Sequence, residues 1–529
     1  PVLIPDKVTV DFDGLSVKAK FTEFENFSRS DHNISFNYGS EINGGRGNFT
    51  FHYSRYDREP IKATEDERMG ISDWRELPEI SGTKWDCTRF RWDSTNSPSG
   101  QFDIIPTVKD SELHKTFALT DSSGEFEIFP ADDPKCQIIL NNSSCIVPDT
   151  ITKRYNMNSE RWIYSRLKRD NLFLTFDYDL SSNLTFFSDV LYYKSDTIQN
   201  NSPSAAFSTS RIIVPANNYW NPFGPVNFND GRANPNRVRL NNTGQDISQT
   251  IPDDGLPILI DWYRYVDVGP RVVNVEKDTY RFLFGLRGAS KNWRWETAIF
   301  TSKANTDDIT SNRLSNSLVE EALSLSTPDA YNPFNGGGNY INYLSTGNDG
   351  TPSTNSSIKN AIIDVYRKGE RKLNSFDFKI TNDSILSIKS GKISFAGGLE
   401  FRSDKFIDDR DPRLDGTIKY IDKDGDTYPF VSDVMNSSPT PDNSGKRDVF
   451  SAYAEFLVPL ISEEMNLFFA KSMNLQIAGR FEDFSDVGSK SVPKIAIGWE
   501  VNKNLFIRGS LSKGFRVPNL VQINESIVS

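Results

Sequence analysis

Hydrophobic and polar residues alternate strictly in the stretch from Asn474 to Leu520. The runs LQIAGRFE (475–482), KIAIGWE (494–500) and LFIRGSLS (505–512) each place aliphatic or aromatic residues on one face and polar or small residues on the other. A period of two residues is typical of β-strands. The join at 501–504 is short enough for a tight hairpin. The stretch therefore predicts three consecutive antiparallel strands.

The same alternation recurs along most of the chain. The predicted strands are residues 15–24, 33–40, 48–57, 168–179, 184–194, 278–288, 293–303, 372–381, 392–402, 447–458, 473–484, 493–500 and 504–515. The joins alternate between two sides, and the long joins, residues 59–167, 195–277, 304–371 and 403–446, all fall on one side. The joins near 25–32 and 485–492 fall on that side as well but are brief. This arrangement predicts long loops at one end of a single sheet.

This rhythm predicts an all-β fold, namely an antiparallel transmembrane β-barrel with long extracellular loops. Outer-membrane barrels have short turns on one side and long loops on the other, with an apolar outside and a polar inside. A soluble sandwich has no reason to collect its long loops at one end. Bacterial outer-membrane barrels have an even number of strands, so thirteen strands cannot close one. We therefore expect the thirteen strands of residues 15–529 to be part of a barrel that is truncated at its C-terminus.

Composition is compatible with this prediction. Mean hydropathy is −0.51, and no run of about 18 apolar residues could form a transmembrane helix. Aromatic residues make up 12 % of the chain, which suits the aromatic girdles of membrane barrels but also the core of a large soluble β-protein. The net charge of −11 argues against nucleic acid as a partner.

Three cysteines and three histidines limit the candidate chemistry. Cys136 and Cys145 bracket a short loop, and this spacing suits a disulfide in an oxidising compartment. Cys87 would then be a free thiol, or its partner would lie outside this chain. No CxxC motif is present, so we expect no zinc site and no other cofactor.

The long joins contain three local patterns with competing interpretations. Gly44, Gly45 and Gly47 lack the Lys-Ser/Thr of a phosphate-binding loop and predict a hairpin turn. The run from Arg313 to Leu325 has apolar residues at helical spacing, which predicts a short packing helix. The acidic run from Asp422 to Asp426 lacks the bidentate Glu of a calcium loop and predicts a solvated turn.

The C-terminal stretch also resembles a known family. The runs AGRFEDFSDVGS, PKIAIGWE and LFIRGSLSKGFRVPNL, in this order, resemble the barrel of a TonB-dependent outer-membrane receptor. The resemblance implies a bacterial outer-membrane location, contact with outer-membrane lipid, and uptake of siderophore-bound iron, cobalamin or a saccharide. It further implies a barrel of about 22 strands, of which about 13 are present here, and a plug domain coupled to a TonB-ExbB-ExbD complex. Residues 1–14 would then be the lead-in from a plug that is missing here.

Two groups of candidate site residues follow. Charged residues on the polar faces of the last three strands are expected to face the lumen, where they would line the cavity and hold the plug. These residues are Arg480, Glu482, Lys494, Glu500 and Arg508. Aromatic residues of two long loops are expected to meet the ligand, because small-ligand sites need apolar walls. They are Tyr219, Trp220, Phe223, Tyr331 and Phe334.

Two other functions remain open from the sequence. A passive porin or a barrel adhesin would use the same wall without a plug. A secreted β-rich glycoside hydrolase would need two carboxylates, and Asp and Glu residues are plentiful. No Ser-His-Asp order or paired carboxylates stand out, so we expect a protein that is not an enzyme.

Overall fold

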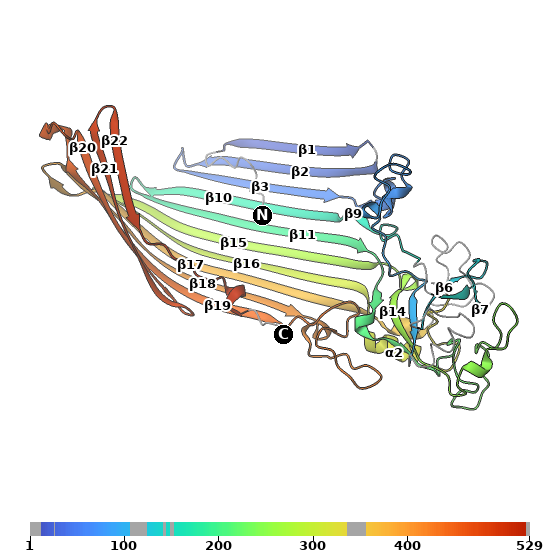
Figure 1. Cartoon of the computed structure of the whole chain (residues 1–529). Coiled ribbons are helices and arrows are strands. Elements are labelled where there is room, and N and C mark those ends of the chain that lie inside the picture. Colours follow the sequence, from blue (N-terminus) through green and yellow to red (C-terminus); the bar gives the residue numbers. More distant parts are fainter. Residues whose placement is uncertain are drawn as a thin grey trace.

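The structure is a computed structural model in which residues 12–25, 27–105, 124–140, 144–148, 153–335 and 356–524 are described. Residues 1–11 of the expected lead-in lie outside this part of the chain. The described residues form a long sheet and, at one end of it, a smaller body built from the long connections (Figure 1).

The long sheet contains thirteen strands among the described residues, and adjacent strands are antiparallel throughout. In spatial order they are β1 (Gly14–Phe24), β2 (Phe27–Ile42), β3 (Gly47–Arg58), β10 (Arg166–Ser181), β11 (Leu184–Asn201), β15 (Arg271–Ser290), β16 (Trp293–Leu314), β17 (Ile362–Ile388), β18 (Gly391–Arg410), β19 (Asn443–Ile461), β20 (Ser472–Phe484), β21 (Gly488–Asn502) and β22 (Leu505–Ser512). Twelve predicted segments lie inside these strands, and the thirteenth overlaps β22. The predicted all-β antiparallel fold is confirmed.

The four long connections all lie at one end of this sheet, and the strands are joined at the opposite end by shorter turns (Figure 1). In the turn between β2 and β3, Asn43, Gly44 and Gly45 have φ angles of 59°, 67° and 88°. Glycine and asparagine are the residues that adopt such angles most readily. Ile42 pairs directly with Gly47 across the turn, so the glycine-rich run is a hairpin turn, as predicted.

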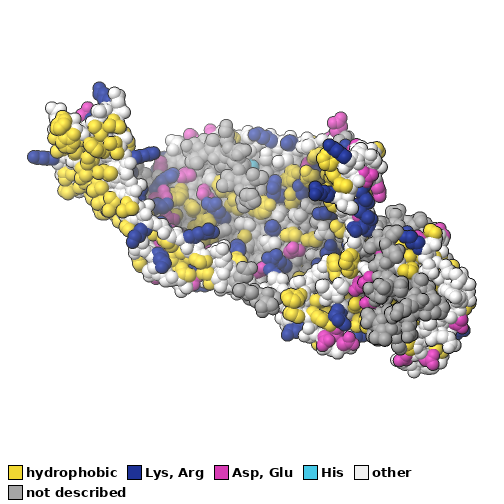
Figure 2. All heavy atoms as spheres, in the orientation of Figure 1, with side chains coloured by type: hydrophobic (Ala, Val, Ile, Leu, Met, Phe, Trp, Pro, Cys, Tyr) yellow, Lys and Arg dark blue, Asp and Glu magenta, His cyan; other side chains and the backbone are white. Residues whose placement is uncertain are grey.

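The two faces of the sheet differ in polarity. Direct cross-strand partners share a face, and Ile299, Phe376, Phe401 and Phe450 form one row across β16 to β19. Ile299 and Phe401 remain 61 % and 51 % exposed, and similar residues cover much of this face. The opposite face is hollowed and carries many charged side chains (Figure 2). One apolar and one charged face are the arrangement expected of a wall between lipid and water.

The long connections fold together into a body that we term the loop domain, formed by the described parts of residues 59–165, 202–270, 314–361 and 411–442. Its larger sheet has the order β12-β14-β5-β6-β8-β7, with β13 paired to β14. A second, two-stranded sheet pairs β4 with β9. The strands of the loop domain are β4 (Ile61–Lys62), β5 (Gln101–Ile104), β6 (Glu125–Pro130), β7 (Ile138–Leu140), β8 (Ser144–Pro148), β9 (Trp162–Tyr164), β12 (Ala205–Phe207), β13 (Ile213–Val214) and β14 (Ile258–Arg264). Its helices are α2 (Asn316–Leu323), α3 (Ser356–Asn360) and α4 (Pro412–Asp415).

One hydrophobic core joins all four connections. Phe102, Phe126, Tyr263, Phe334 and Tyr420 are buried in it, and between them they come from every connection. The ring centroid of Phe102 lies 5.4 Å from that of Phe126 and 5.0 Å from that of Phe334. This order differs from the long loop that the sequence predicts for the first connection. The difference arises because β5 pairs with β14, about 150 residues away, and alternation within one segment cannot report such pairing.

Helix α2 fits the predicted packing helix. Leu314, just before it, and Ala322 are buried in the core, and Leu318 packs against the core. Leu325 lies beyond the end of the helix and is 37 % exposed. The side chain of Ser315 caps the first turn by accepting a hydrogen bond from the Leu318 amide at 3.3 Å, so the helix begins at Asn316 and is shorter than the predicted run from Arg313 to Leu325.

Candidate functional site

The five charged residues predicted to face the lumen share one face of the sheet. Arg480 pairs with Val492, so Lys494 and Glu500 lie on its face at intervals of two residues. Arg508 pairs with Gly498 and belongs to the same face, as does Glu482. Their places along the strands differ, however, and only part of the set comes together.

Arg480 and Glu482 form the centre of an ion-pair network. The Arg480 guanidinium lies 2.6 Å from Glu482 and 3.4 Å from Glu400 of β18, and Ser451 donates a hydrogen bond to Glu482. Glu500 lies farther toward the short turns, where Lys471 contacts it at 3.2 Å. The network therefore ties three neighbouring strands together on the hollowed face.

A cavity of about 770 Å³ lies beside this network. Arginine dominates its lining, since five arginines from strands β17 to β20 and from the segment after β22 converge on it together with two carboxylates. These residues are Arg371, Arg402, Arg447, Arg480, Arg516, Asp404 and Glu482. Of these residues only Arg480 and Glu482 were predicted from the sequence, although the alternation of β17 to β19 places Arg371, Arg402 and Arg447 on the polar face as well.

The segment after β22 crosses the hollowed face and closes one side of the cavity. Arg447 binds both carboxylate oxygens of Asp486 at 2.7–2.9 Å and donates to the carbonyl of Pro518 at 3.0 Å. Helix α5 (Leu520–Asn524) then packs on β19. The strand predicted to reach residue 515 therefore ends at Ser512, because the following residues turn onto the wall.

This arrangement is suited to binding anions. Guanidinium groups form paired, charge-assisted hydrogen bonds with carboxylate and phosphate groups. Several arginines on one wall, partly neutralised by Glu400, Glu482 and Asp404, can exchange those partners for anionic groups of a ligand or of another domain. The sequence pattern predicted the charged face, and the structure identifies where the charges converge.

The predicted ligand-contacting aromatics take a different position. Phe223, Tyr331 and Phe334 are buried in the loop-domain core, whereas Tyr219 and Trp220 are partly exposed at its edge. In both Asn-Pro-Phe runs the Asn side chain accepts a hydrogen bond from the Phe amide, at 2.9 Å in the first and 3.0 Å in the second. This turn directs the Phe ring into the core. The structure therefore gives these three aromatics a packing role, and ligand contact stays a prediction for Tyr219 and Trp220.

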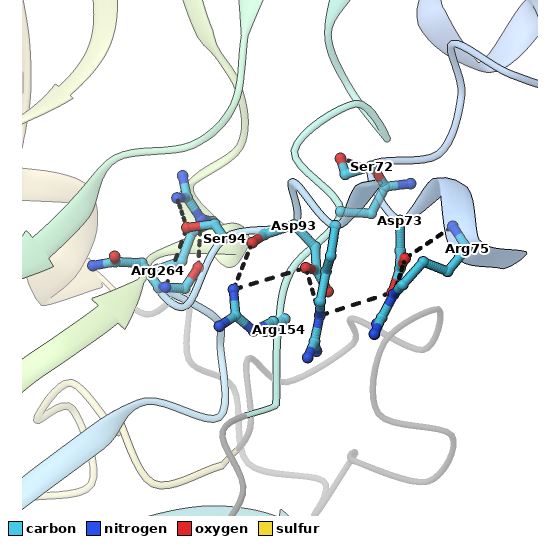
Figure 3. A network of polar contacts seen from close by, with 10 residues as sticks. Ser72, Asp73, Arg75, Asp93, Ser94, Arg154 and Arg264 are labelled. Carbon is cyan, nitrogen blue, oxygen red and sulfur yellow. Dashed lines mark hydrogen bonds and ion pairs between the residues drawn. The ribbon is translucent and has the colours of Figure 1, made fainter. Parts of the chain in front are cut away.

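A polar network fastens the first connection of the loop domain to the second. Asp73 and Asp93 bridge three arginines of the first connection, and Arg154 is one of them (Figure 3). Arg264 of β14 is buried and donates hydrogen bonds to the carbonyl of Asn96 at 2.9 Å and to the Ser94 hydroxyl at 3.1 Å. The network therefore holds the first and second connections together.

Glu320 of α2 is a buried carboxyl at the meeting point of three connections. The Ile213 amide lies 3.5 Å from its Oε1, and Tyr420, Lys423 and Asp422 lie nearby. Burial raises the pKa of Glu320 to about 7. Because the folded state holds this proton more tightly than the unfolded state, the contribution of Glu320 to stability is fully present below the ordinary pKa of 4.5 and is lost as pH rises toward 7.

Replacing Glu320 with glutamine should remove this pH dependence. We expect E320Q to make the loop domain more stable than the native chain at pH 8, by about 1–2 kcal/mol, and to change its stability little at pH 4. Thermal unfolding followed by limited proteolysis at both pH values measures the difference. E321Q is the matched control, because Glu321 is the exposed neighbour in the same helix. Equal responses of the two variants would contradict this role of Glu320.

Cys136 and Cys145 are buried near each other in the loop domain. Cys145 pairs with Ile139 in the β7–β8 ladder, and its thiol donates a hydrogen bond to the carbonyl of Pro130 at 3.5 Å. Contact with Cys136 and burial raise the pKa of the Cys145 thiol. Both cysteines are free thiols in the structure, as is Cys87, so the disulfide stays a prediction.

Counting reactive thiols tests the disulfide. In protein purified from an oxidising compartment without reductant, we expect an alkylating reagent to modify only Cys87 under denaturing conditions. Prior reduction should expose all three thiols, and a C136S variant should add a reactive Cys145 without reduction. Three reactive thiols in the unreduced native chain would exclude the pairing. Mass spectrometry of the intact protein provides the count.

The acidic run of the fourth connection is a turn. Asp422 accepts hydrogen bonds from the amides of Asp424 at 3.0 Å and Asp426 at 2.9 Å, which closes the loop on itself. Within the described ranges, no three His, Cys, Asp or Glu side chains are grouped in a way that could hold a metal ion. In the same part of the chain, no helix has both the length and the apolarity needed to cross a membrane.

Comparison with known proteins gives one family match. The family model described as TonB dependent receptor-like, beta-barrel, matches residues 257–527, slightly more than half of the chain. No curated protein sequence matches.

Among solved structures, the chain is similar to a mutant of the ferric enterobactin receptor PfeA of Pseudomonas aeruginosa, with 10 % identity over 96 % of this chain and 44 % of that one, and a TM-score of 0.38. It is also similar to the siderophore receptor PirA of Acinetobacter baumannii, with 12 % identity over 97 % and 44 % and a TM-score of 0.39. The chain thus spans less than half the length of these structures.

Proposed function

Because this chain belongs to the TonB-dependent receptor family through its β-barrel, we propose that it forms part of the wall of a bacterial outer-membrane receptor for nutrient uptake. The nutrient would be scarce and too large for passive diffusion, such as a siderophore-iron complex, cobalamin or a saccharide. One observation carries the proposal: a single antiparallel sheet has an apolar exposed face, a charged hollowed face, and all its long connections gathered at one end.

The positions of the loop domain, the cavity and the lumen-facing residues suggest a role for each in uptake. The loop domain stands at the outer end of the wall, where Tyr219 and Trp220 would meet the ligand first. The arginine-lined cavity lies on the hollowed face, where it would hold anionic groups of the ligand or of a plug domain. A TonB-ExbB-ExbD complex would supply energy through that plug. The remaining lumen-facing residues, Lys494, Glu500 and Arg508, would line the path nearer the short turns.

We further propose that residues 15–529 supply part of a larger barrel and that residues 1–14 lead in from a plug. In the described part of the chain, β1 and β22 are the two edges of the sheet. Unpaired backbone groups at such edges are not tolerated in lipid, so both edges would pair with further strands.

Growth and uptake measurements test the proposed function. A strain lacking the gene for this protein should lose growth on a limiting concentration of its nutrient, and the encoded protein should restore growth only in cells with an intact TonB system. Candidate ferric siderophores, cobalamin and oligosaccharides identify the nutrient. Uptake that continues without TonB, or after collapse of the proton gradient, would contradict energised transport and favour a passive porin.

A further inference from the structure

Four lysines form a continuous row across four neighbouring strands. Lys303 of β16 pairs with Lys372 of β17, Lys372 pairs with Lys405 of β18, and Lys405 pairs with Lys446 of β19. The side chains of Lys303 and Lys405 are each 46 % exposed and that of Lys446 is 61 % exposed; Lys372 is exposed as well. Like charges directly opposite each other are unfavourable in a sheet, so this row calls for an explanation other than stability.

The row lies on the apolar face of the wall. Residues two apart in a strand share a face, so Phe376, Asn374 and Lys372 lie in line on the same side of β17. The same order recurs in β18, where Ser403 separates Lys405 from Phe401. The lysines therefore point away from the arginine-lined cavity, toward the side where the wall is covered by aliphatic and aromatic residues.

The height of the row places it at the membrane surface. On β18 the outer positions from Phe401 to Ile393 are apolar or glycine, which is about 27 Å along the strand and about 21 Å across the membrane for a tilt of about 40°. This is close to the roughly 25 Å apolar band of outer-membrane barrels. Lys405 lies four residues farther toward the loop domain, about 13 Å along the strand. The row is therefore level with lipid headgroups on the loop-domain side.

Local carboxylates leave the row with excess positive charge. Glu370 lies 2.9 Å from Lys303 and 3.9 Å from Lys405, and Asp448 lies 2.8 Å from Lys446. Asp483 lies on the same face just below Asp448, so four lysines against three carboxylates leave a charge of about +1. Asp278 of the next strand also approaches Lys303, and Lys194 is its direct cross-strand partner.

Two apolar depressions of about 600 Å³ each lie below the row. The upper one is lined by Ile299, Phe376, Phe401 and Phe450, with Asn374, Ser403 and Asp448 at its rim. The lower one is hollow because small residues replace large ones between Phe378 and Phe481. These small residues are Gly397, Ala452, Ala454 and Gly479. A Cβ added at Gly479 would meet nothing within 4 Å, so the hollow is open to hydrocarbon chains.

We propose that the lysine row binds the phosphate-bearing headgroup of an anionic membrane lipid whose acyl chains lie in the two depressions. Lysine ammonium groups are compact charges that bind phosphate from several directions. The apolar depressions adjoin the charged row, so a lipid could contact both, whereas free phosphate would contact only the lysines. This favours a lipid as the ligand. The inference rests on the proposed placement of the wall in a membrane.

Lipid titration of the full encoded protein in detergent tests the proposal. The probes are dioleoyl phosphatidic acid, dioleoyl phosphatidylcholine and inorganic phosphate, and native mass spectrometry counts the bound molecules. We expect the native chain to prefer phosphatidic acid. The variant K303Q/K372Q/K405Q/K446Q should lose at least tenfold in affinity for it. The matched control K18Q/K20Q/K84Q/K359Q removes the same charge from exposed lysines elsewhere and should bind like the native chain.

A variant with the opposite effect adds a second test. E370Q removes the carboxylate that competes for Lys303 and Lys405, so it should bind phosphatidic acid more tightly, by about two- to fivefold. Equal losses in the two quadruple variants, an unchanged or weaker E370Q, or equal binding of phosphatidylcholine would overturn the proposal. Phosphatidic acid displaced by millimolar phosphate would indicate an anion site without acyl recognition and would also overturn it.

Cell fractionation separates failure of this inference from failure of the proposed function. If the native chain and both quadruple variants enter the outer-membrane fraction but do not differ in lipid binding, only the lipid site is wrong. If the native chain is absent from that fraction, the membrane placement itself is wrong and the lipid site falls with it.

Discussion

Replacing Phe102 with alanine is expected to lower the free energy of unfolding of the loop domain by about 3–5 kcal/mol, the range for a buried phenylalanine. Phe102 is fully buried, and its ring lies within 5.0–6.1 Å of the rings of Phe126, Tyr263 and Phe334. The substitution would leave a cavity bordered by three of the four long connections. Limited proteolysis at increasing temperature, with identification of the cut sites, measures the loss.

Trp85 provides the control for this prediction. It is a larger aromatic residue in the same connection, but it is 52 % exposed and packs mainly on Phe90 and Lys84. W85A should therefore change the stability of the loop domain by less than about 1 kcal/mol. If F102A is no more sensitive to protease than W85A, the shared core does not hold the connections together.

Replacing Arg237 with methionine is expected to destabilise the second connection by about 3–5 kcal/mol. The buried Arg237 guanidinium donates to the carbonyls of Gly224 at 2.6 Å, Ile251 at 2.7 Å, Pro252 at 2.9 Å and Ser248 at 3.2 Å. Methionine fills a similar volume but leaves these carbonyls without a donor. We expect protease cleavage within residues 224–252 in the variant under conditions where the native chain is intact.

Arg239 is the matched control, because it lies two residues away and is exposed. R239M removes the same charge without removing buried hydrogen bonds, so it should be cleaved like the native chain. R237K should restore only part of the resistance to protease, since one ammonium group cannot reach four carbonyls as the planar guanidinium does. Equal cleavage of R237M and R239M would show that Arg237 does not secure this connection.

The candidate site was partly predictable from the sequence. Arg480 and Glu482 alternate with apolar neighbours in one strand, so their shared face follows from local pattern alone. Their proximity to Arg402 and Arg447 depends on the register between β18, β19 and β20, which cannot be deduced from the sequence pattern. Recognising these arginines required knowing which strand positions lie opposite each other.

The buried aromatics show where a local pattern was misleading. Phe223 and Phe334 lie in polar, proline-containing segments, and such segments usually run over a protein surface. Here four segments supply enough apolar residues to build a core together, although none could do so alone. Each long connection taken alone therefore predicted that these aromatic residues contact a ligand, whereas in the structure they pack in the core of the loop domain.

Local pattern in the chain was enough to specify the wall: thirteen strands, their order, their turns and the polarity of each face. Alternation carries this information because successive side chains of a strand point to opposite faces, and this geometry depends only on near neighbours. The loop domain, the cavity where arginines converge and the row of lysines on the outer face depended on the folded arrangement. These features join residues tens to hundreds of positions apart, and only strand register and the packing of connections against one another bring them together.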